Sequence, residues 1–190
     1  MTENKKYEFV EGDTIIAPNG KTLRRIRALV AIGLTVAAGD FGGYIEAESN
    51  LSVSGDAWVS GDAWVYGNAR VSGDARVSDY AQVFGNAQVF GNAWVYGNAW
   101  VYDNARVYGN AWVSDNARVS GNAAIVWFSN VGSENGTLTV FKGENGLIVT
   151  HGCFCGSIDE FLEASNKNHN EKIKREYQLL IEVAKSRIGE

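Results

Sequence analysis

The sequence predicts a mainly β protein whose central part coils into a parallel β-helix, with a small β cap before it and a β-hairpin plus α-helix after it. Three observations support this prediction. A six-residue repeat runs without a slip from Val53, each hexad opens with a valine, and an alanine stands two residues before the next valine. A fixed short period is typical of solenoid proteins, in which each repeat packs only on its neighbours.

Each hexad is expected to form one short strand and one corner. Side chains alternate between the two sides of a strand, so the valine and the preceding alanine share one side, which we assign to the interior. Between them stand pairs such as Gly67-Asn68, whose residue types readily adopt left-handed backbone conformations. Stacked asparagines, such as Asn86, Asn104 and Asn122, are expected to form hydrogen-bonded ladders along a corner.

Three strands and three corners close a coil of about 18 residues, and successive coils stack at the β-sheet spacing of roughly 4.8 Å. The hexads from Val53 to Asn130 predict about four such coils, with Ile125 and Val131 continuing the valine ladder. A helical alternative is disfavoured because six is not a helical period and glycine recurs in nearly every repeat.

The pattern of an aliphatic residue, two or three turn residues and a small residue resembles the hexapeptide-repeat β-helix superfamily. This resemblance implies a triangular prism, a left-handed coil and frequent homotrimers. A narrower resemblance rests on LRRIRAL at Leu23–Leu29, GDFGGYIEAESNLS at Gly39–Ser52 and the GNAWVYGNARV-type run. These segments are similar to a group of largely uncharacterised phage and prophage proteins, which implies a viral origin.

Residues 1–50 are expected to form a β cap over the first coil, and residues 51–132 are expected to form the β-helix. The cap contains KYEFV, DTIIA and LRRIRAL, which alternate like strands, with a turn at Pro18-Asn19-Gly20. Such a cap would cover backbone groups that the first coil otherwise leaves unpaired. The glycines of GDFGG are expected to let the chain turn into that coil, since the segment lacks the context of a nucleotide-binding loop.

Residues 133–190 are expected to cover the other end of the β-helix. TLTVF and GLIVTHG flank the turn Gly143-Glu144-Asn145-Gly146 and predict a β-hairpin. Ser157 and Glu160 have the spacing of a helix capping box, and Glu171–Ile188 has an apolar stripe at helical spacing. The helix could also pack between subunits.

Composition indicates in which cellular compartment the protein is found and which classes of partner are disfavoured. The net charge of −5 disfavours a generic nucleic-acid binder, which needs clustered lysine and arginine. Cys153 and Cys155 are too close in sequence for an easy disulfide and fit a reducing compartment. The start of the chain shows no secretory signal, and the most apolar run, Ala28–Ala38, is too short to span a bilayer. We predict a protein of the bacterial host cytoplasm without membrane association.

Catalytic and metal sites are not assigned from this sequence, and no cofactor is expected. Acyltransferases of the hexapeptide superfamily commonly use a histidine as general base, but His151 and His169 both lie outside the repeats. His151, Cys153 and Cys155 could supply three metal ligands, yet a structural zinc site needs a fourth ligand and usually wider spacing. A hairpin strand with partly buried thiols is favoured, and no companion base is placed to make either cysteine a nucleophile.

The outward positions of the repeat carry aromatic residues and arginine where serine, threonine, lysine or glutamate would be usual. Stacked rings and arginine–aromatic contacts can serve only to stabilise a sheet. Exposed apolar patches, however, mark interfaces, and Trp, Tyr and Arg are enriched at binding hot spots. We therefore predict an interaction face made of Trp58, Trp64, Tyr66, Phe84, Trp94, Tyr96, Trp100, Tyr102, Trp112, Arg76, Arg106 and Arg118.

These features predict a non-enzymatic scaffold for protein interactions, covered on at least one face by a protein partner or by further copies in a homo-oligomer, a dimer or trimer. The phage likeness suggests that the protein binds or inhibits a host protein. One alternative is a hexapeptide-type acyltransferase that works as a trimer. Another is a ligand or nucleic-acid binder that stacks bases or rings on Trp and Arg, although the acidic charge disfavours nucleic acid.

Overall fold

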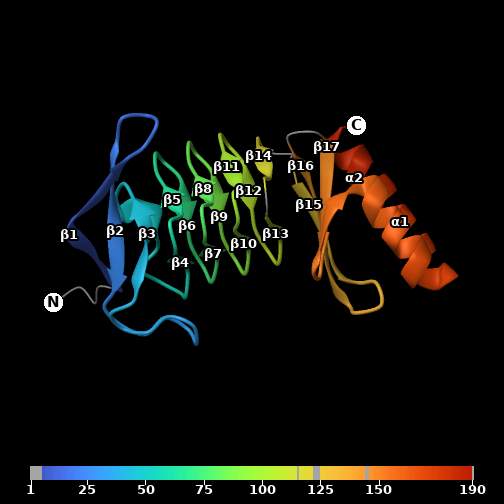
Figure 1. Ribbon diagram of the computed structural model, residues 1–190, viewed down its shortest axis with the longest axis horizontal. Coiled ribbons are helices and arrows are strands. Elements are labelled where there is room, and N and C mark those ends of the chain that lie inside the picture. Colours follow the sequence, from blue (N-terminus) through green and yellow to red (C-terminus); the bar gives the residue numbers. More distant parts are fainter. Residues whose placement is uncertain (1–5, 115, 122–124, 144–145, 190) are drawn as a thin grey trace.

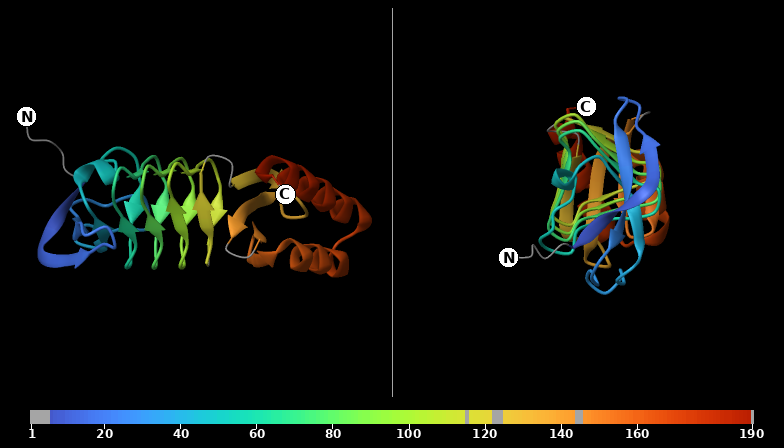
Figure 2. Two further views of the ribbon diagram at one scale, coloured as in Figure 1. Left: turned by 90° about the horizontal axis from the view of Figure 1, so that it is seen from above. Right: turned by 90° about the vertical axis from the view of Figure 1, so that its left-hand side faces the viewer.

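The computed structural model describes residues 6–114, 116–121, 125–143 and 146–189. A β-solenoid forms the middle of the molecule (Figure 1). Three N-terminal strands cover one end of it, and a C-terminal sheet with two helices covers the other (Figure 2). The predicted mainly β fold with a parallel β-solenoid is confirmed.

The solenoid strands pair three apart in sequence order, which produces three parallel faces. The first face contains β5, β8, β11 and β14, the second face contains β4, β7, β10 and β13, and the third face contains β6, β9 and β12. Their bounds are β4 Trp58–Val59, β5 Trp64–Val65, β6 Arg70–Val71, β7 Arg76–Val77, β8 Gln82–Val83, β9 Gln88–Val89, β10 Trp94–Val95, β11 Trp100–Tyr102, β12 Arg106–Val107, β13 Trp112–Val113 and β14 Arg118–Ser120.

Stacked positions in this solenoid are one coil apart in sequence. Trp94 pairs with Trp112, and Asn68 is hydrogen-bonded to Asn86, 18 residues further on. The coil length is therefore the predicted one, and the solenoid has about four turns. The left-handed winding and the trimeric state stay predictions.

The interior is built as the repeat pattern predicts. The valines and alanines of the hexads from Ala57 to Val119 are at most 2% exposed wherever they are described. Val53 is an exception, because it is 59% exposed and Leu51 bridges to Val71 in its place. The chain enters the first coil at Ile45, which pairs with Val65, 20 residues further on. This coil is therefore two residues longer than the later ones, in which paired residues are 18 apart.

The expectation that Ile125 and Val131 continue the valine ladder is wrong. Both belong to β15 (Ile125–Val131), which leaves the solenoid and pairs antiparallel with the next strand, β16 (Gly136–Gly143). Val131 packs in the C-terminal core instead. Ala123, the last alanine of the repeat, lies outside the described residues. The division of the chain into three units stays a prediction. The pairing of β15 with β16 joins residues 125–131, which were assigned to the β-helix, to the C-terminal sheet.

The corners have the expected backbone conformation. Gly67 has a φ of 70°, and Asp103, which replaces glycine in its hexad, has a φ of 55°. The asparagine ladder is confirmed at Asn68, Asn86 and Asn104, whose amides are linked by hydrogen bonds of 3.1 and 3.2 Å. Asn122, the predicted next member, lies outside the described residues.

Corner glycines are expected to be costly to replace where coils touch. Gly85 and Gly121 occupy the same corner with φ values of 70° and 72°. A Cβ on Gly85 would lie 2.9 Å from the Asp103 amide nitrogen, whereas no described atom lies within 4 Å of one on Gly121. We expect Gly121→Ala to lower the free energy of unfolding by about 1–2 kcal/mol and Gly85→Ala by about 2–4 kcal/mol. Urea denaturation tests this, and equal costs would contradict the crowding argument.

The N-terminal strands extend the first face of the solenoid. β1 (Tyr7–Ile16) and β2 (Thr22–Ala28) form an antiparallel pair around the predicted turn, and β3 (Phe41–Ile45) joins β2 to β5. A Cβ on Gly42 or Gly43 would lie within 2.5 Å of atoms of Ile26 or Ala63, so glycine is required for β3 to pack on the first coil. The short helix η1 (Glu48–Asn50) follows.

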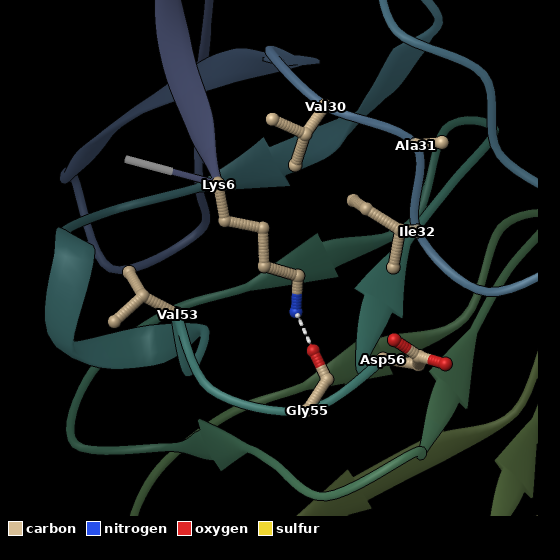
Figure 3. A pocket seen from close by; sticks show the side chains of 7 residues that line it. All are labelled: Lys6, Val30, Ala31, Ile32, Val53, Gly55 and Asp56. Atoms are coloured by element: carbon tan, nitrogen blue, oxygen red, sulfur yellow. Dashed lines mark hydrogen bonds between the residues drawn. The ribbon is translucent and has the colours of Figure 1, made fainter. Parts of the chain in front are cut away.

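Polar side chains satisfy the backbone carbonyls at this end of the solenoid. The Lys6 ammonium donates to the carbonyls of Ser52, Gly55 and Ala57 at 3.1, 2.9 and 2.7 Å. Figure 3 shows this side chain entering a small cavity of about 140 Å³ toward Gly55. Asn50, which is fully buried, donates to two further carbonyls of the next coil. The unpaired edge of the first coil is thereby closed.

The C-terminal unit is an antiparallel sheet of β15, β16, β17 (Gly146–His151) and β18 (Phe154–Ser157), followed by α1 (Ile158–Asn168) and α2 (Glu171–Ile188). The predicted hairpin is β16–β17, in which Gly143 pairs with Gly146; Glu144 and Asn145 lie outside the described residues. The Ser157–Glu160 capping box and the second helix are confirmed. The outer strands β15 and β18 were not predicted.

This sheet closes the far end of the solenoid. Phe141 of β16 is fully buried in the same core as the solenoid valines. The Trp112 amide donates to Thr139 Oγ1 at 3.3 Å, and Thr150 Oγ1 donates to the Trp112 carbonyl at 3.0 Å. Among the described residues, no helix is long and apolar enough to cross a membrane.

Candidate interaction groove on the solenoid

The N-terminal strands bury two residues of the predicted interaction face. Trp58 is 2% exposed and packs edge-to-face on Tyr7 at 6.4 Å, and Tyr66 is 6% exposed in a cluster with Leu23 and Tyr44. The prediction that these two side chains face solvent is wrong, because the repeat period does not reveal what covers the first coil.

The remaining aromatics of the first face have partners within the chain. Phe84 stacks between Tyr66 and Tyr102 with ring centroids 5.1 and 5.2 Å apart. The Arg118 guanidinium lies 4.3 Å from the Trp100 ring centroid and also donates to backbone carbonyls of the neighbouring corner. Trp64 is half-buried. These contacts stabilise the sheet, although Trp100 remains 37% exposed.

The aromatics of the third face also pack on neighbours within the chain, although Tyr108 remains 41% exposed. Phe90 and Tyr108 stack with centroids 5.0 Å apart, and Trp127 of β15 packs edge-on against Tyr108 at 4.3 Å. Arg106 lies over the Phe90 ring at 5.4 Å. Its aromatic column therefore ends against the C-terminal sheet.

The second face differs because two exposed tryptophans stack on each other. Trp94 and Trp112 stack with ring centroids 5.4 Å apart and planes inclined by 12°, and they are 46% and 38% exposed. Tyr96 lies half-buried on the strand-flanking position of the same face. The stacking fixes both indole rings before any partner arrives.

A loop of residues 29–40 stands beside this face and turns it into a groove of about 460 Å³. The loop projects below the first coils (light blue in Figure 1). One wall comes from the loop and the start of β3, and the floor comes from β4, β7 and β10 with the positions that follow them. The lining residues are Thr35, Val36, Asp40, Phe41, Trp58, Ser60, Arg76, Ser78 and Trp94.

The loop is anchored at several points. Ile32 and Val36 form an isolated antiparallel bridge and bury their side chains in the solenoid core. The Asp40 carboxylate accepts a hydrogen bond of 2.7 Å from the Ala37 amide. Leu34 at the tip and Phe41 at the base are exposed. The anchored loop and Phe41 thus form a fixed wall of the groove, and Trp94 lines the same groove.

The chemistry of the groove is that of a binding surface. Arg76 and Asp40 are its charged lining residues, and Ser60 and Ser78 add hydroxyl groups between apolar rings. Mostly apolar walls with a few placed polar groups suit the recognition of another molecule. Within the described part of the chain, no group of three or more His, Cys, Asp and Glu could hold a metal ion.

The structure brings together part of the predicted site and adds residues that the sequence did not indicate. Trp94, Trp112 and Arg76 lie on one face as the 18-residue coil predicts. Phe41 and the loop wall were missed, because the loop lies outside the repeat and no local pattern shows that it folds back. Its only signal was the apolar run Ala28–Ala38, which is unusual for an exposed loop.

The histidines and cysteines lie away from this groove. His151 and His169 are in the C-terminal unit. Cys153 and Cys155 are both exposed, so the expectation of partly buried thiols is wrong. Cys155 Sγ lies 3.7 Å from the hydroxyl of Ser114 on the last coil.

Comparison with known proteins agrees with the fold. The YdcK beta solenoid repeat family matches residues 63–79, 69–85, 81–97, 87–103 and 99–115, which together run from β5 to the corner after β13. No curated protein matches the chain. The central part of the chain is therefore similar to YdcK-type repeats, and the protein is a β-solenoid repeat protein.

Proposed function

We propose that the protein is a non-enzymatic interaction scaffold that binds a partner protein in the groove of the second face. The observation that carries this proposal is the stacked, exposed pair Trp94–Trp112 beside the loop wall with Phe41. On the other two faces, the corresponding aromatics pack on the cap strands, on Arg118 or on Trp127.

The energetics of the groove favour a specific contact. Burying an aromatic side chain removes about 150–250 Å² from water, and each Å² of apolar surface contributes about 25 cal/mol. Covering what remains exposed of Trp94, Trp112 and Phe41 therefore supplies several kcal/mol of favourable free energy. Because the tryptophans are already stacked, binding orders few additional side chains. Arg76 beside them adds a residue type that is common at hot spots.

The proposed partner is a protein of a bacterial host, met in its cytoplasm and inhibited or recruited by binding. This part rests on the likeness of Leu23–Leu29 and Gly39–Ser52 to phage and prophage proteins. Membership of the hexapeptide-repeat superfamily and a homo-oligomeric state belong to the same proposal. An acyltransferase function has less support, because neither histidine lies on the solenoid.

The test compares capture of host proteins by the wild type and by two matched variants. Trp94→Gln/Trp112→Gln removes the exposed pair, and Trp100→Gln removes a tryptophan of the first face that is 37% exposed, close to the 38% of Trp112. We expect a bacterial protein that the wild type and Trp100→Gln retain equally and that the double variant retains at least ten-fold less. Circular dichroism checks that all three proteins keep the solenoid.

Two outcomes would contradict the proposal. Equal recovery with the double variant would move the binding surface away from the groove. Recovery of nothing but further copies of the chain, with an assembly that sedimentation shows to be lost in the double variant, would make the second face a contact between subunits.

A further inference from the structure

We propose that the C-terminal unit contains a second, separate binding site, which takes a small organic cation. The site is a cavity of about 300 Å³ between the β17–β18 hairpin and the two helices. Its volume is at the lower end of the range of small-molecule pockets. Nothing in the solenoid groove contributes to it, so it can be tested independently of the proposed function.

Five aromatic rings contribute to the cavity wall. Phe161 of α1 lies between Phe154 and Tyr177, with ring centroids 5.3 and 5.0 Å away. His151 and His169 lie edge-to-face against Tyr177 at 5.4 and 5.5 Å. All five rings line the cavity.

Hydrogen bonds connect His151 and Tyr177 at the centre of the wall. His151 Nδ1 lies 3.1 Å from the Thr137 carbonyl, which only accepts, so this nitrogen carries a proton. The Tyr177 hydroxyl is hydrogen-bonded to His151 Nε2 at 2.8 Å and accepts from the Ser133 amide. Burial raises the pKa of Tyr177, which keeps the phenol protonated. The histidine and the tyrosine therefore hold each other in place.

Among the described residues that line the cavity, Glu134 is the one carboxylate, and no lysine or arginine is present. Its carboxylate lies near Gly152 at the tip of the hairpin, where a Cβ would be 3.5 Å from Oε2. Aromatic faces attract cations through their quadrupole, and a carboxylate at the rim adds to that attraction. The complementary ligand is an alkylammonium group.

Two buried polar atoms on the same wall also lack partners. Ser165 Oγ on α1 and His169 Nδ1 at its end have no hydrogen-bond partner within the described structure, and Ser165 is buried. Both residues line the cavity. Buried polar groups without partners are uncommon, and they indicate a missing ligand or water. A cation with a hydroxyl group nearby would satisfy the rings and these atoms together.

The experiment uses choline chloride and its uncharged analogue of the same shape, 3,3-dimethylbutan-1-ol, with the full chain. We expect saturable choline binding by calorimetry, with shifts of the histidine and phenylalanine ring protons in NMR spectra, and binding of the alcohol at least ten-fold weaker. Glu134→Gln should weaken choline binding at least five-fold, as should Phe154→Leu. Glu163→Gln, which removes an exposed carboxylate of α1 paired with Lys167, should leave it unchanged.

Equal binding of choline and the alcohol would overturn the recognition of charge. Choline binding that both cavity variants leave unaltered would place the cation elsewhere and overturn the site. The absence of any saturable choline signal at millimolar concentration, with the wild type folded, would overturn the proposal as a whole. None of these outcomes bears on the capture experiment, because the solenoid groove is unchanged in every variant.

Discussion

Phe141→Ala is expected to lower the free energy of unfolding by about 3–5 kcal/mol, the usual cost of deleting a fully buried aromatic side chain. Phe141 has no exposed surface and packs among the solenoid valines although it belongs to the C-terminal sheet. Deleting the ring leaves a cavity at the junction of the two parts. Urea denaturation followed by circular dichroism measures the change.

A matched surface variant separates this effect from a general loss of apolar area. Leu179→Ala removes an exposed leucine from the outer side of α2 and is expected to change the free energy of unfolding by less than about 0.5 kcal/mol. If Phe141→Ala cost as little as Leu179→Ala, the sheet would not be packed on the last coil as described. If Phe141→Ala split the transition into two steps, the ring would be the main link between solenoid and sheet.

Lys6→Met is expected to lower the free energy of unfolding by about 2–3 kcal/mol near neutral pH. Methionine keeps the apolar stem but leaves the carbonyls of Ser52, Gly55 and Ala57 without the ammonium that binds them. Thermal and urea denaturation of both proteins measure the difference. A change below about 0.5 kcal/mol would show that water replaces the ammonium at no cost.

The same residue predicts a pH dependence. Burial lowers the pKa of Lys6 from 10.5 to about 8. Below pH 8 both the folded and the unfolded chain carry this proton, so the contribution of the lysine is constant. Between pH 8 and 10.5 the unfolded chain binds more protons than the folded chain, so the stability of the wild type rises with pH relative to Lys6→Met. A difference that stays constant over this range would mean that the carbonyls keep the amine charged.

The sequence predicts the regular part of the fold because each hexad repeats one local solution. Val59 and Ala57 face inward and a left-handed corner follows, and the next hexad then packs in the same surroundings. A prediction made for one hexad therefore holds equally for the following ones. The ends are different. Leu51 takes the position expected for Val53, and β15 leaves the solenoid at Ile125. In both segments the pairing with residues distant in sequence decides the structure, and the repeat pattern does not.

The candidate groove was predictable in part for the same reason. The coil length places Trp94 over Arg76 and under Trp112, so one column of the groove follows from counting residues. Whether a column is open or covered depends on other segments. Tyr66 is buried by the N-terminal strands, while Phe41 gains its place in the groove wall from a loop that no period describes.

The C-terminal cavity could not be predicted from the sequence. Its rings come from β17, β18, α1 and α2, and His151 and Tyr177 are 26 residues apart. Neither residue belongs to a spacing that predicts contact, and the hydrogen bond between them depends on how α2 packs on the sheet. Tyr177 belongs to the apolar stripe of Glu171–Ile188, which predicts that its ring is buried. The structure adds the hydrogen bond between its hydroxyl and His151.

Because every third strand pairs, the number of hexads also fixes the angle between the two ends of the solenoid about its long axis. Gain or loss of three hexads together would change its length by one thread, about 4.8 Å, and leave the angle between its two ends unaltered. Gain or loss of a single hexad would rotate the C-terminal unit by one third of a turn relative to the loop that walls the groove. A protein that contacts both ends would therefore constrain the number of hexads to steps of three.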